Sequence, residues 1–273
     1  MDHCEEVSPG VASPITGHGW SAPALGDVSD DTIARLVRDI EKTGFAMLPG
    51  YIAASDLKHL QQFVETKIAD ADNQYTALTG NAAFVGTMLG AIGESPTFLS
   101  LMHRIYAKAY GPSIPRQAIY QVLRCLKGET GLKHAYFFHY DSYVVTALLP
   151  IIVPTSGNMG NLLMKPNCRA VRSSYFGNLL DKLLVDNKLA QVLFRFAART
   201  HRAGFSDVMI VPGNLYFFWG YRTIHANAPC DIDKIRATAL FHFADPHAGS
   251  ALRKITGRAK VRAAVEKEPE LAV

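Results

Sequence analysis

The sequence predicts a mainly β, α+β fold: a double-stranded β-helix (jelly roll) core braced by N-terminal helices, with a helical insert. Three observations predict it. Apolar residues recur at helical spacing in the first 110 residues, whereas short runs of β-branched and aromatic residues dominate after residue 118. The length of 273 residues, 48% of them hydrophobic and without an internal repeat, fits one large domain. We therefore expect a single domain over residues 27–250.

Three helices are expected before the β-rich part. The first begins at a cap formed by Ser29 or Asp30 and ends at Gly44. Its apolar face holds Ile33, Leu36, Val37 and Ile40. Ser55 is expected to cap the second helix, and the third is expected over residues 96–110. Between the first two helices, the run GFAMLPGYI predicts a strand.

Short apolar runs after residue 118 predict the strands of the core. They are IYQVLRCL, AYFFHYD, YVVTALLPIIV, NLLMKP, DVMIVP, NLYFFWG, TIHANAP and ATALFHFAD. A helical insert is expected to interrupt them at about 175–198. Its helical spacing is carried by Leu179, Leu180, Leu183, Leu184, Leu189, Val192, Leu193 and Phe196.

The two ends of the chain are expected to lie outside this domain. Residues 1–26 are rich in Ser, Pro and Gly without periodicity, which predicts a flexible N-terminal segment. Residues 251–273 predict a C-terminal helix or tail with several basic side chains. These are Arg253, Lys254, Arg258, Lys260 and Arg262. A solvated helix face is the favoured interpretation of this run, with an anion-binding patch as the alternative.

Composition and charge argue against several classes of protein. The net charge of +4 is too mild to indicate a nucleic-acid partner. The four cysteines lie far apart without a CxxC motif, which fits reduced thiols and a cytoplasmic location. The first residues lack the apolar core of a signal peptide, and the longest apolar run, 143–154, is too short to span a membrane. The sequence does not indicate an oligomeric state.

An imidazole and a carboxylate stand two residues apart, at His139 and Asp141, in a strongly apolar stretch. On a strand these side chains would share one face. Burying a carboxylate costs several kcal/mol without a compensating partner, so a metal ion beside Asp141 is one candidate. The alternative is a core histidine that satisfies the carboxylate. Chance alone produces about one H-x-[D/E] tripeptide in this composition; the other one, at His3 and Glu5, is set aside because it lies in the N-terminal segment.

A second histidine strengthens the metal hypothesis. His225 lies in a further apolar and aromatic stretch, downstream of a turn at Pro212 and Gly213. Two histidines and one carboxylate can occupy one face of an octahedral metal and leave three positions open, as in non-haem Fe(II) oxygenases. Zinc is the rival metal. The H-E-x-x-H motif that zinc hydrolases usually carry is absent from the sequence.

Arg236 supplies an independent indication. It lies 11 residues after His225 and opens the apolar run RATALFHF. A guanidinium that enters an apolar barrel needs an anionic partner. Thr238 shares its face of the strand, so the two could hold a carboxylate together. A structural ion pair with Asp231 or Asp233, or exposure at the strand end, is the alternative.

Together these residues resemble the Fe(II)- and 2-oxoglutarate-dependent dioxygenases, in particular the phytanoyl-CoA dioxygenase-like branch. The run GFAMLPGYIAASDLKHL is similar to the opening strand and helix of that branch. His139 and Asp141 match its H-x-D motif, His225 its distal histidine, and Arg236 its 2-oxoglutarate arginine. The resemblance covers roughly residues 29–246.

The resemblance implies roles for individual residues. His139, Asp141 and His225 would bind Fe(II), and Arg236 would pair with the distal carboxylate of 2-oxoglutarate. Three further residues are implied to contact this cosubstrate: Asn227, which replaces the usual serine, Thr238 and Gln121. Three aromatic residues either line the pocket or fill the core. They are Tyr136, Tyr143 and Trp219.

The implied reaction is hydroxylation of an unactivated C–H bond in a small or mid-sized metabolite, with consumption of O₂ and release of succinate and CO₂. Related halogenases lack the carboxylate, so Asp141 argues against halogenation. Desaturation, epimerisation and ring formation are alternatives within the family. Two alternatives come from other classes: a non-catalytic jelly-roll binding module, and a cupin-like metal isomerase or hydrolase, for which only His134 offers a further histidine near the first motif.

Overall fold

The computed structural model describes residues 21–23, 28–113 and 117–255. The predicted N-terminal segment therefore lies almost entirely outside the described residues. Of the predicted C-terminal tail, only residues 251–255 are described, and they are helical. Arg258, Lys260 and Arg262 lie outside the described part.

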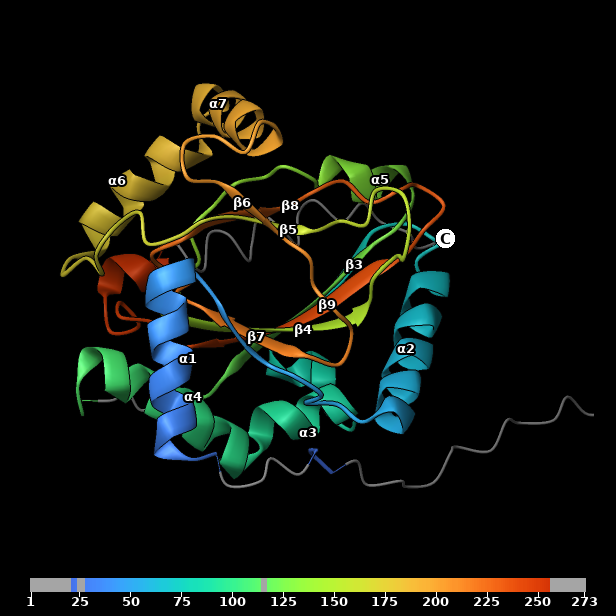
Figure 1. The fold of residues 1–273 in the computed structure, drawn as a ribbon, viewed down its shortest axis with the longest axis horizontal. Helices are drawn as coiled ribbons and strands as arrows, with labels where there is room; N and C mark the ends of the chain where they lie inside the picture. The colour runs from blue at the N-terminus through green and yellow to red at the C-terminus, as the bar shows by residue number, and fades with distance from the viewer. Residues whose placement is uncertain (1–20, 24–27, 114–116, 256–273) are drawn as a thin grey trace, which may run out of the picture.

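Two antiparallel sheets form the centre of the molecule (Figure 1). The larger one has the strand order β1-β7-β4-β9-β3-β2, and the smaller one has the order β6-β5-β8. The strands of the larger sheet are β1 (Ala46–Leu48), β7 (Leu215–Phe218), β4 (Val145–Ile152), β9 (Arg236–Phe243), β3 (Tyr120–Leu126) and β2 (Thr76–Thr79). Those of the smaller sheet are β6 (Ser206–Val208), β5 (Leu162–Lys165) and β8 (Ile224–Asn227).

Helices cover the outer face of the larger sheet, and the smaller sheet lies on its other side (Figure 1). These helices are α1 (Asp30–Thr43), α2 (Ala54–Ala69), α3 (Met88–Glu94) and α4 (Pro96–Tyr110), with a short 3₁₀ turn, η1 (Asn81–Phe84). A second apolar cluster joins the two sheets, for example through Leu148 and Phe218 on one sheet and Leu162 on the other. This mixed architecture of helices and antiparallel sheets is consistent with the predicted jelly roll.

Strand β9 shows how the sequence pattern places the site. Its odd-numbered residues Ala237, Ala239, Phe241 and Phe243 belong to the core under the helices. Its even-numbered residues point the other way, and Thr238, Leu240 and His242 line a cavity between the two sheets. The alternation follows from the two-residue period of a strand. Polar groups can therefore reach the cavity without interrupting the apolar core.

The first and third predicted helices are confirmed. Ser29 caps α1 by accepting a hydrogen bond from the Thr32 amide at 3.2 Å. Gly44 ends it with φ 93° and closes against Pro166, where a Cβ would clash. The expected cap of the second helix is wrong. Helix α2 begins at Ala54, so Ser55 lies inside its first turn and not at the cap position, and no side chain caps this helix.

The expected strand AYFFHYD is also wrong. A helix, α5 (Gly128–Lys133), precedes this run, and Tyr136 has φ 55°, which takes the chain out of the extended conformation. Within the run, only His139 forms a bridge, with His225. Strand β2 and helices α3 and α5 were not predicted.

Two helices, α6 (Tyr175–Asp186) and α7 (Lys188–Arg199), occupy the segment where the helical insert was expected. They pack against the outer face of the smaller sheet through Val185 and Ala198. Their outward faces are apolar, and Leu184 and Leu189 are 68% and 70% exposed. Among the described residues, no helix combines the length and apolar character needed to cross a bilayer.

Candidate metal centre

His139, Asp141 and His225 converge on one point between the sheets. One ligand atom from each lies within 4.8 Å of the others. The Oδ1 atom of Asp141 is 3.8 Å from Nε2 of His139 and 3.5 Å from Nε2 of His225. This is the only such cluster of His, Cys, Asp and Glu side chains among the described residues.

Hydrogen bonds fix the tautomer of both histidines. Nδ1 of His139 lies 3.0 Å from the carbonyl oxygen of Phe137, and Nδ1 of His225 lies 3.1 Å from that of Thr223. Because a carbonyl only accepts, each Nδ1 carries the proton and donates it. In the neutral ring each Nε2 then carries a lone pair on the side of Asp141, and this is the form in which histidine binds a metal. Burial, reinforced by the neighbouring His225, lowers the pKa of His139 to about 3.

The backbone holds the three ligands in register although no strand contains the H-x-D motif. His139 and His225 exchange backbone hydrogen bonds of 3.1 Å in both directions. The Asp141 amide donates to the carbonyl of Gly220 at 3.0 Å. A Cβ at position 220 would collide with the side chains of Asp141 and Thr146, so only glycine allows this approach.

The second carboxylate oxygen of Asp141 is also held. Oδ2 accepts a hydrogen bond of 2.6 Å from the Thr146 hydroxyl. The Thr146 oxygen lies 3.1 Å from Nδ1 of His242, which is itself 3.6 Å from Oδ2. Burial alone would raise the pKa of Asp141, but His225 and His242 outweigh it and hold this pKa well below its usual value. The carboxylate is therefore ionised, and its Oδ1 faces Nε2 of both histidines.

The cavity beside the triad is lined from both sheets. The larger sheet contributes Arg124, Leu148, Thr238, Leu240 and His242, and the smaller sheet and the connecting segments contribute Leu162, Ala226, Asn227, His134 and Phe137. Asn227 and Thr238 were both predicted at the site, and both line the cavity. Thr146, Gly220, His242 and Arg124 were not predicted. Side chains alternate between the two faces of β9, so counting every second residue from Arg236 would have placed His242 on the cavity side.

Arg236 is completely buried, and its guanidinium lacks an anionic partner among the described residues. Nη1 donates to the Thr238 hydroxyl at 3.2 Å, whereas Nε and Nη2 have no hydrogen-bond partner. Burial lowers the pKa of Arg236 to about 10. The alternative ion pair is not formed, because Asp231 binds Lys234 and Asn158 instead. Two unpaired N–H donors and a buried charge call for an anion.

Gln121 does not lie at this site. It stands on the face of β3 opposite to Arg124, and its amide packs against Gly93 of α3. Both polar atoms of the amide are buried without a hydrogen-bond partner. The parity of the strand explains this placement, because residues 121 and 124 are an odd number of positions apart.

None of the three aromatic candidates lines the cavity. Trp219 is a fully buried core residue that donates to Glu41 at 2.8 Å. Tyr136 stacks under Arg199 on the outer side of the smaller sheet. Tyr143 lies next to the site, with its ring stacked on His242 at 5.2 Å between centroids.

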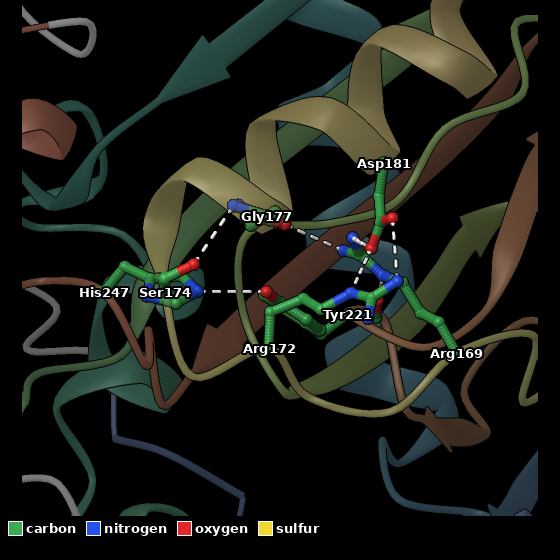
Figure 2. A network of polar contacts seen from close by, with 8 residues as sticks. Arg169, Arg172, Ser174, Gly177, Asp181, Tyr221 and His247 are labelled. Atoms are coloured by element: carbon green, nitrogen blue, oxygen red, sulfur yellow. Dashed lines mark hydrogen bonds and ion pairs between the residues drawn. The ribbon is translucent and has the colours of Figure 1, made fainter.

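A polar network around Arg169, Asp181 and Tyr221 lies close to the H-x-D segment, and Figure 2 shows the contacts of Arg169 with Asp181 and Tyr221. The Arg169 guanidinium lies between the rings of Tyr140 and Tyr221, at 3.9 and 4.1 Å from their centroids. Its nitrogens donate to Asp181 of α6 at 2.9 Å and to the carbonyl of Tyr221 at 2.7 Å. Helix α6 is thereby joined to the residue between the two H-x-D ligands.

Helix α7 is joined to the residue before His139. The amide of Gln191 accepts from the Phe138 backbone N–H at 2.9 Å and donates to its carbonyl at 2.7 Å. Both neighbours of His139, Phe138 and Tyr140, are therefore fixed by the two helices. This support compensates for the absence of a regular strand at the H-x-D motif.

No protein-family model and no curated protein matches the chain. Solved structures with a similar fold include a prolyl hydroxylase from Trichoplax adhaerens, in complex with a hypoxia inducible factor oxygen degradation domain peptide fragment. It is 15% identical with a TM-score of 0.53, and the match covers 81% of this chain and 94% of that one. A prolyl 4-hydroxylase from Phytophthora capsici is 10% identical with a TM-score of 0.52, over 85% of this chain and 70% of that one. At these identities the likeness shows a shared fold.

Proposed function

We propose that the chain is an Fe(II)- and 2-oxoglutarate-dependent oxygenase that hydroxylates an unactivated C–H bond of a small or mid-sized metabolite. The observation that carries this proposal is the pairing of two features, one in the cavity and one directly beside it. A triad of two histidines and one carboxylate presents three metal donors. On the same face of β9, next to that cavity, a buried guanidinium lacks an anion. A dicarboxylate that chelates the metal at one end would supply this anion at its other end.

The donor set fits iron. His139 and His225 would bind it through Nε2 and Asp141 through Oδ1, and two histidines with one carboxylate on one side of a metal are typical of non-haem Fe(II) oxygenases. When bound, the iron supplies the activation of O₂. Thr146 and His242 would keep Asp141 ionised and oriented by holding its other oxygen.

The cosubstrate would lie between the metal and Arg236. Nε and Nη2 of Arg236 would receive its distal carboxylate, with the Thr238 hydroxyl beside them. Asn227 lines the same cavity and offers a neutral amide contact. Arg236 then gains a compensating charge, which removes the cost of burying an isolated guanidinium.

The wider classification is part of the same proposal. We place the chain in the phytanoyl-CoA dioxygenase-like branch, with one jelly-roll domain over residues 27–250 and α6 and α7 as its helical insert. The described cysteines Cys125, Cys168 and Cys230 are free thiols, which supports a reducing, cytoplasmic location.

Anaerobic titration tests this function. Adding 2-oxoglutarate to the Fe(II)-loaded protein is expected to produce a visible charge-transfer absorption, and admitting O₂ should release succinate. His225→Ala should abolish the absorption, whereas Arg35→Met, an exposed control on α1, should leave it unchanged. A protein that binds Fe(II) but shows neither 2-oxoglutarate binding nor succinate release would contradict the proposal.

A further inference from the structure

We propose that Arg124 is the recognition site for an anionic group of the substrate, so that the substrate class is a carboxylate or a comparable anion. This inference rests on the proposed function, since it concerns the cavity that the metal and 2-oxoglutarate would share. Nothing in the sequence motif points to Arg124.

Strand geometry directs Arg124 into the cavity. It stands on β3 directly opposite Thr238 of β9, and both residues line the cavity beside the triad. Leu123 and Cys125, its neighbours in the chain, belong to the core on the other face of the sheet. The alternation of the strand therefore turns the one charged side chain of this segment toward the metal centre.

Among the described residues, the guanidinium of Arg124 has no anionic partner. Within the described part of the chain it forms neither a hydrogen bond nor an ion pair, although it is only partly exposed. Its charge reaches the metal side of the cavity. Together with burial, which is the larger cause, it lowers the pKa of His242. Of the acidic side chains described, only Asp141 lines the cavity.

Charge balance indicates what this guanidinium is for. A divalent metal and Arg236 carry the positive charge of the loaded site, and Asp141 and the dianionic 2-oxoglutarate carry the negative charge. These contributions cancel. The two ligand histidines do not change the balance, because each donates through Nδ1 to a backbone carbonyl and would bind the metal through Nε2 as a neutral ring. Arg124 then leaves one positive charge unmatched inside the cavity, and an anionic substrate would neutralise it.

The two arginines are suited to different ligands. Arg236 is fully buried at the start of β9, where a ligand can be enclosed. Arg124 is partly exposed and shares the cavity wall with Phe137, whose side chain is 53% exposed. The ring of His134 is fixed by stacking on Tyr75 at 3.7 Å. The solvent-accessible side of the cavity thus offers one cation beside aromatic surface, which suits an incoming anionic molecule with an apolar part.

Fluorine NMR can test this recognition without knowledge of the natural substrate. The protein is loaded with Mn(II), which broadens nearby fluorine signals, and saturated with 2-oxoglutarate. Two matched pairs of probes are then compared: trifluoroacetate with trifluoroacetamide, and 4-fluorophenylacetate with 4-fluorophenylacetamide. At least one acid should bind about tenfold more tightly than its amide, because only the acid forms a charge-assisted pair with Arg124.

Variants assign the preference to Arg124. Arg124→Gln should abolish the difference between acid and amide, Arg124→Lys should keep part of it, and the exposed control Arg35→Gln should keep all of it. Equal binding of acid and amide to the wild-type protein, or an acid preference that survives Arg124→Gln, would overturn the inference.

The affinity for 2-oxoglutarate separates this inference from the proposed function. Calorimetry of the Mn(II)-loaded protein should give the same 2-oxoglutarate affinity for Arg124→Gln as for the wild type. A large loss of this affinity in Arg124→Gln would assign Arg124 to the cosubstrate and overturn the substrate role. Failure of the wild-type protein to bind 2-oxoglutarate would instead contradict the proposed function itself.

Discussion

The site has a metal end, formed by the triad, and an arginine end, formed by Arg124 and Arg236, and the two differ in how completely the chain satisfies their polar groups. At the metal end, both Nδ1 atoms of the ligand histidines and the outer oxygen of Asp141 have hydrogen-bond partners within the chain. Of the two arginines, Arg236 beside the cavity keeps two unpaired nitrogens, and Arg124 on the cavity wall has no hydrogen bond or ion pair within the described part of the chain. The first end is preorganised by the fold, and the second lacks the anions that would complete it.

This difference distinguishes polar groups that are paired within the protein from polar groups that are left unpaired for a ligand. Buried polar groups in folded proteins are nearly always paired, so an unpaired one marks either a cost to stability or a ligand. Removing a side chain of the triad should therefore abolish metal-dependent activity and should raise the stability of the empty protein only a little. Removing one of the two guanidinium groups, by contrast, should weaken ligand binding and at the same time stabilise the empty protein.

The largest effect is expected at the metal end. Asp141→Ala removes one ligand and the only carboxylate that the described residues place in the cavity, so metal-dependent succinate release should fall to the background level. Metal binding measured by calorimetry, with succinate release measured in parallel, checks this. Succinate formation at the wild-type rate would show that Asp141 is not a ligand.

At the other end, Arg236→Met should raise the apparent KM for 2-oxoglutarate by about 100-fold, because two charge-assisted hydrogen bonds are lost. The same change should stabilise the empty protein by about 1–3 kcal/mol, since it replaces a buried unpaired charge by an apolar side chain. Saturating 2-oxoglutarate, at about 100 times its Kd, should stabilise the wild type by about 2.7 kcal/mol, which cancels most of the variant's advantage or reverses the order.

Thermal unfolding with and without 2-oxoglutarate measures both effects. Arg35→Met, at an exposed salt bridge on α1, is the control and should change neither value appreciably. An empty Arg236→Met protein that is less stable than the wild type would mean that Arg236 is satisfied in the free state, and the contrast between the two ends would then be lost.

The sequence alone could predict the elements whose signals are local. Helix α1 was located by Ser29, its apolar spacing and Gly44, and residues 96–110 were located by the pattern of α4. The H-x-D motif, His225 and Arg236 could be predicted as site residues because each is a polar group in an apolar run. These signals need no knowledge of what packs against them.

The remaining features depend on tertiary contacts that no local pattern encodes. Thr146 and Gly220 matter because the fold brings them against Asp141, and neither stands in an unusual sequence context. The apolar residues of α6 and α7 also show what a local sequence pattern cannot predict. Their spacing predicted helices, but Leu184 and Leu189 are exposed, since periodicity does not say what a face packs against.

A smaller effect is expected for the residue that orients the metal ligand. Thr146→Val keeps the shape of the side chain but removes the hydrogen bond to Oδ2 of Asp141. Metal affinity should fall by about 10- to 100-fold, as is usual when a partner of a ligand is lost. Thr146→Ser, which retains the hydroxyl, is the matched control and should restore most of the affinity. Equal affinities for the Val and Ser variants would indicate that Asp141 needs no such support.

The smallest functional effect is expected for substitution of Gln121. This residue tests whether an unpaired buried polar group affects the site when it lies away from the cavity. Like Arg236, Gln121 is buried with unpaired polar atoms, but its amide lies against Gly93 on the helical side of the sheet. Gln121→Met should therefore leave the KM for 2-oxoglutarate unchanged and should leave stability equal or raise it by about 1 kcal/mol, because an unsatisfied amide is replaced by a thioether of similar size. Steady-state kinetics and thermal unfolding check both values. A rise in KM comparable to that of Arg236→Met would show that an unpaired polar group can affect the site from the opposite face of β3. The place of Arg236 beside the cavity would then no longer explain its effect on the KM for 2-oxoglutarate.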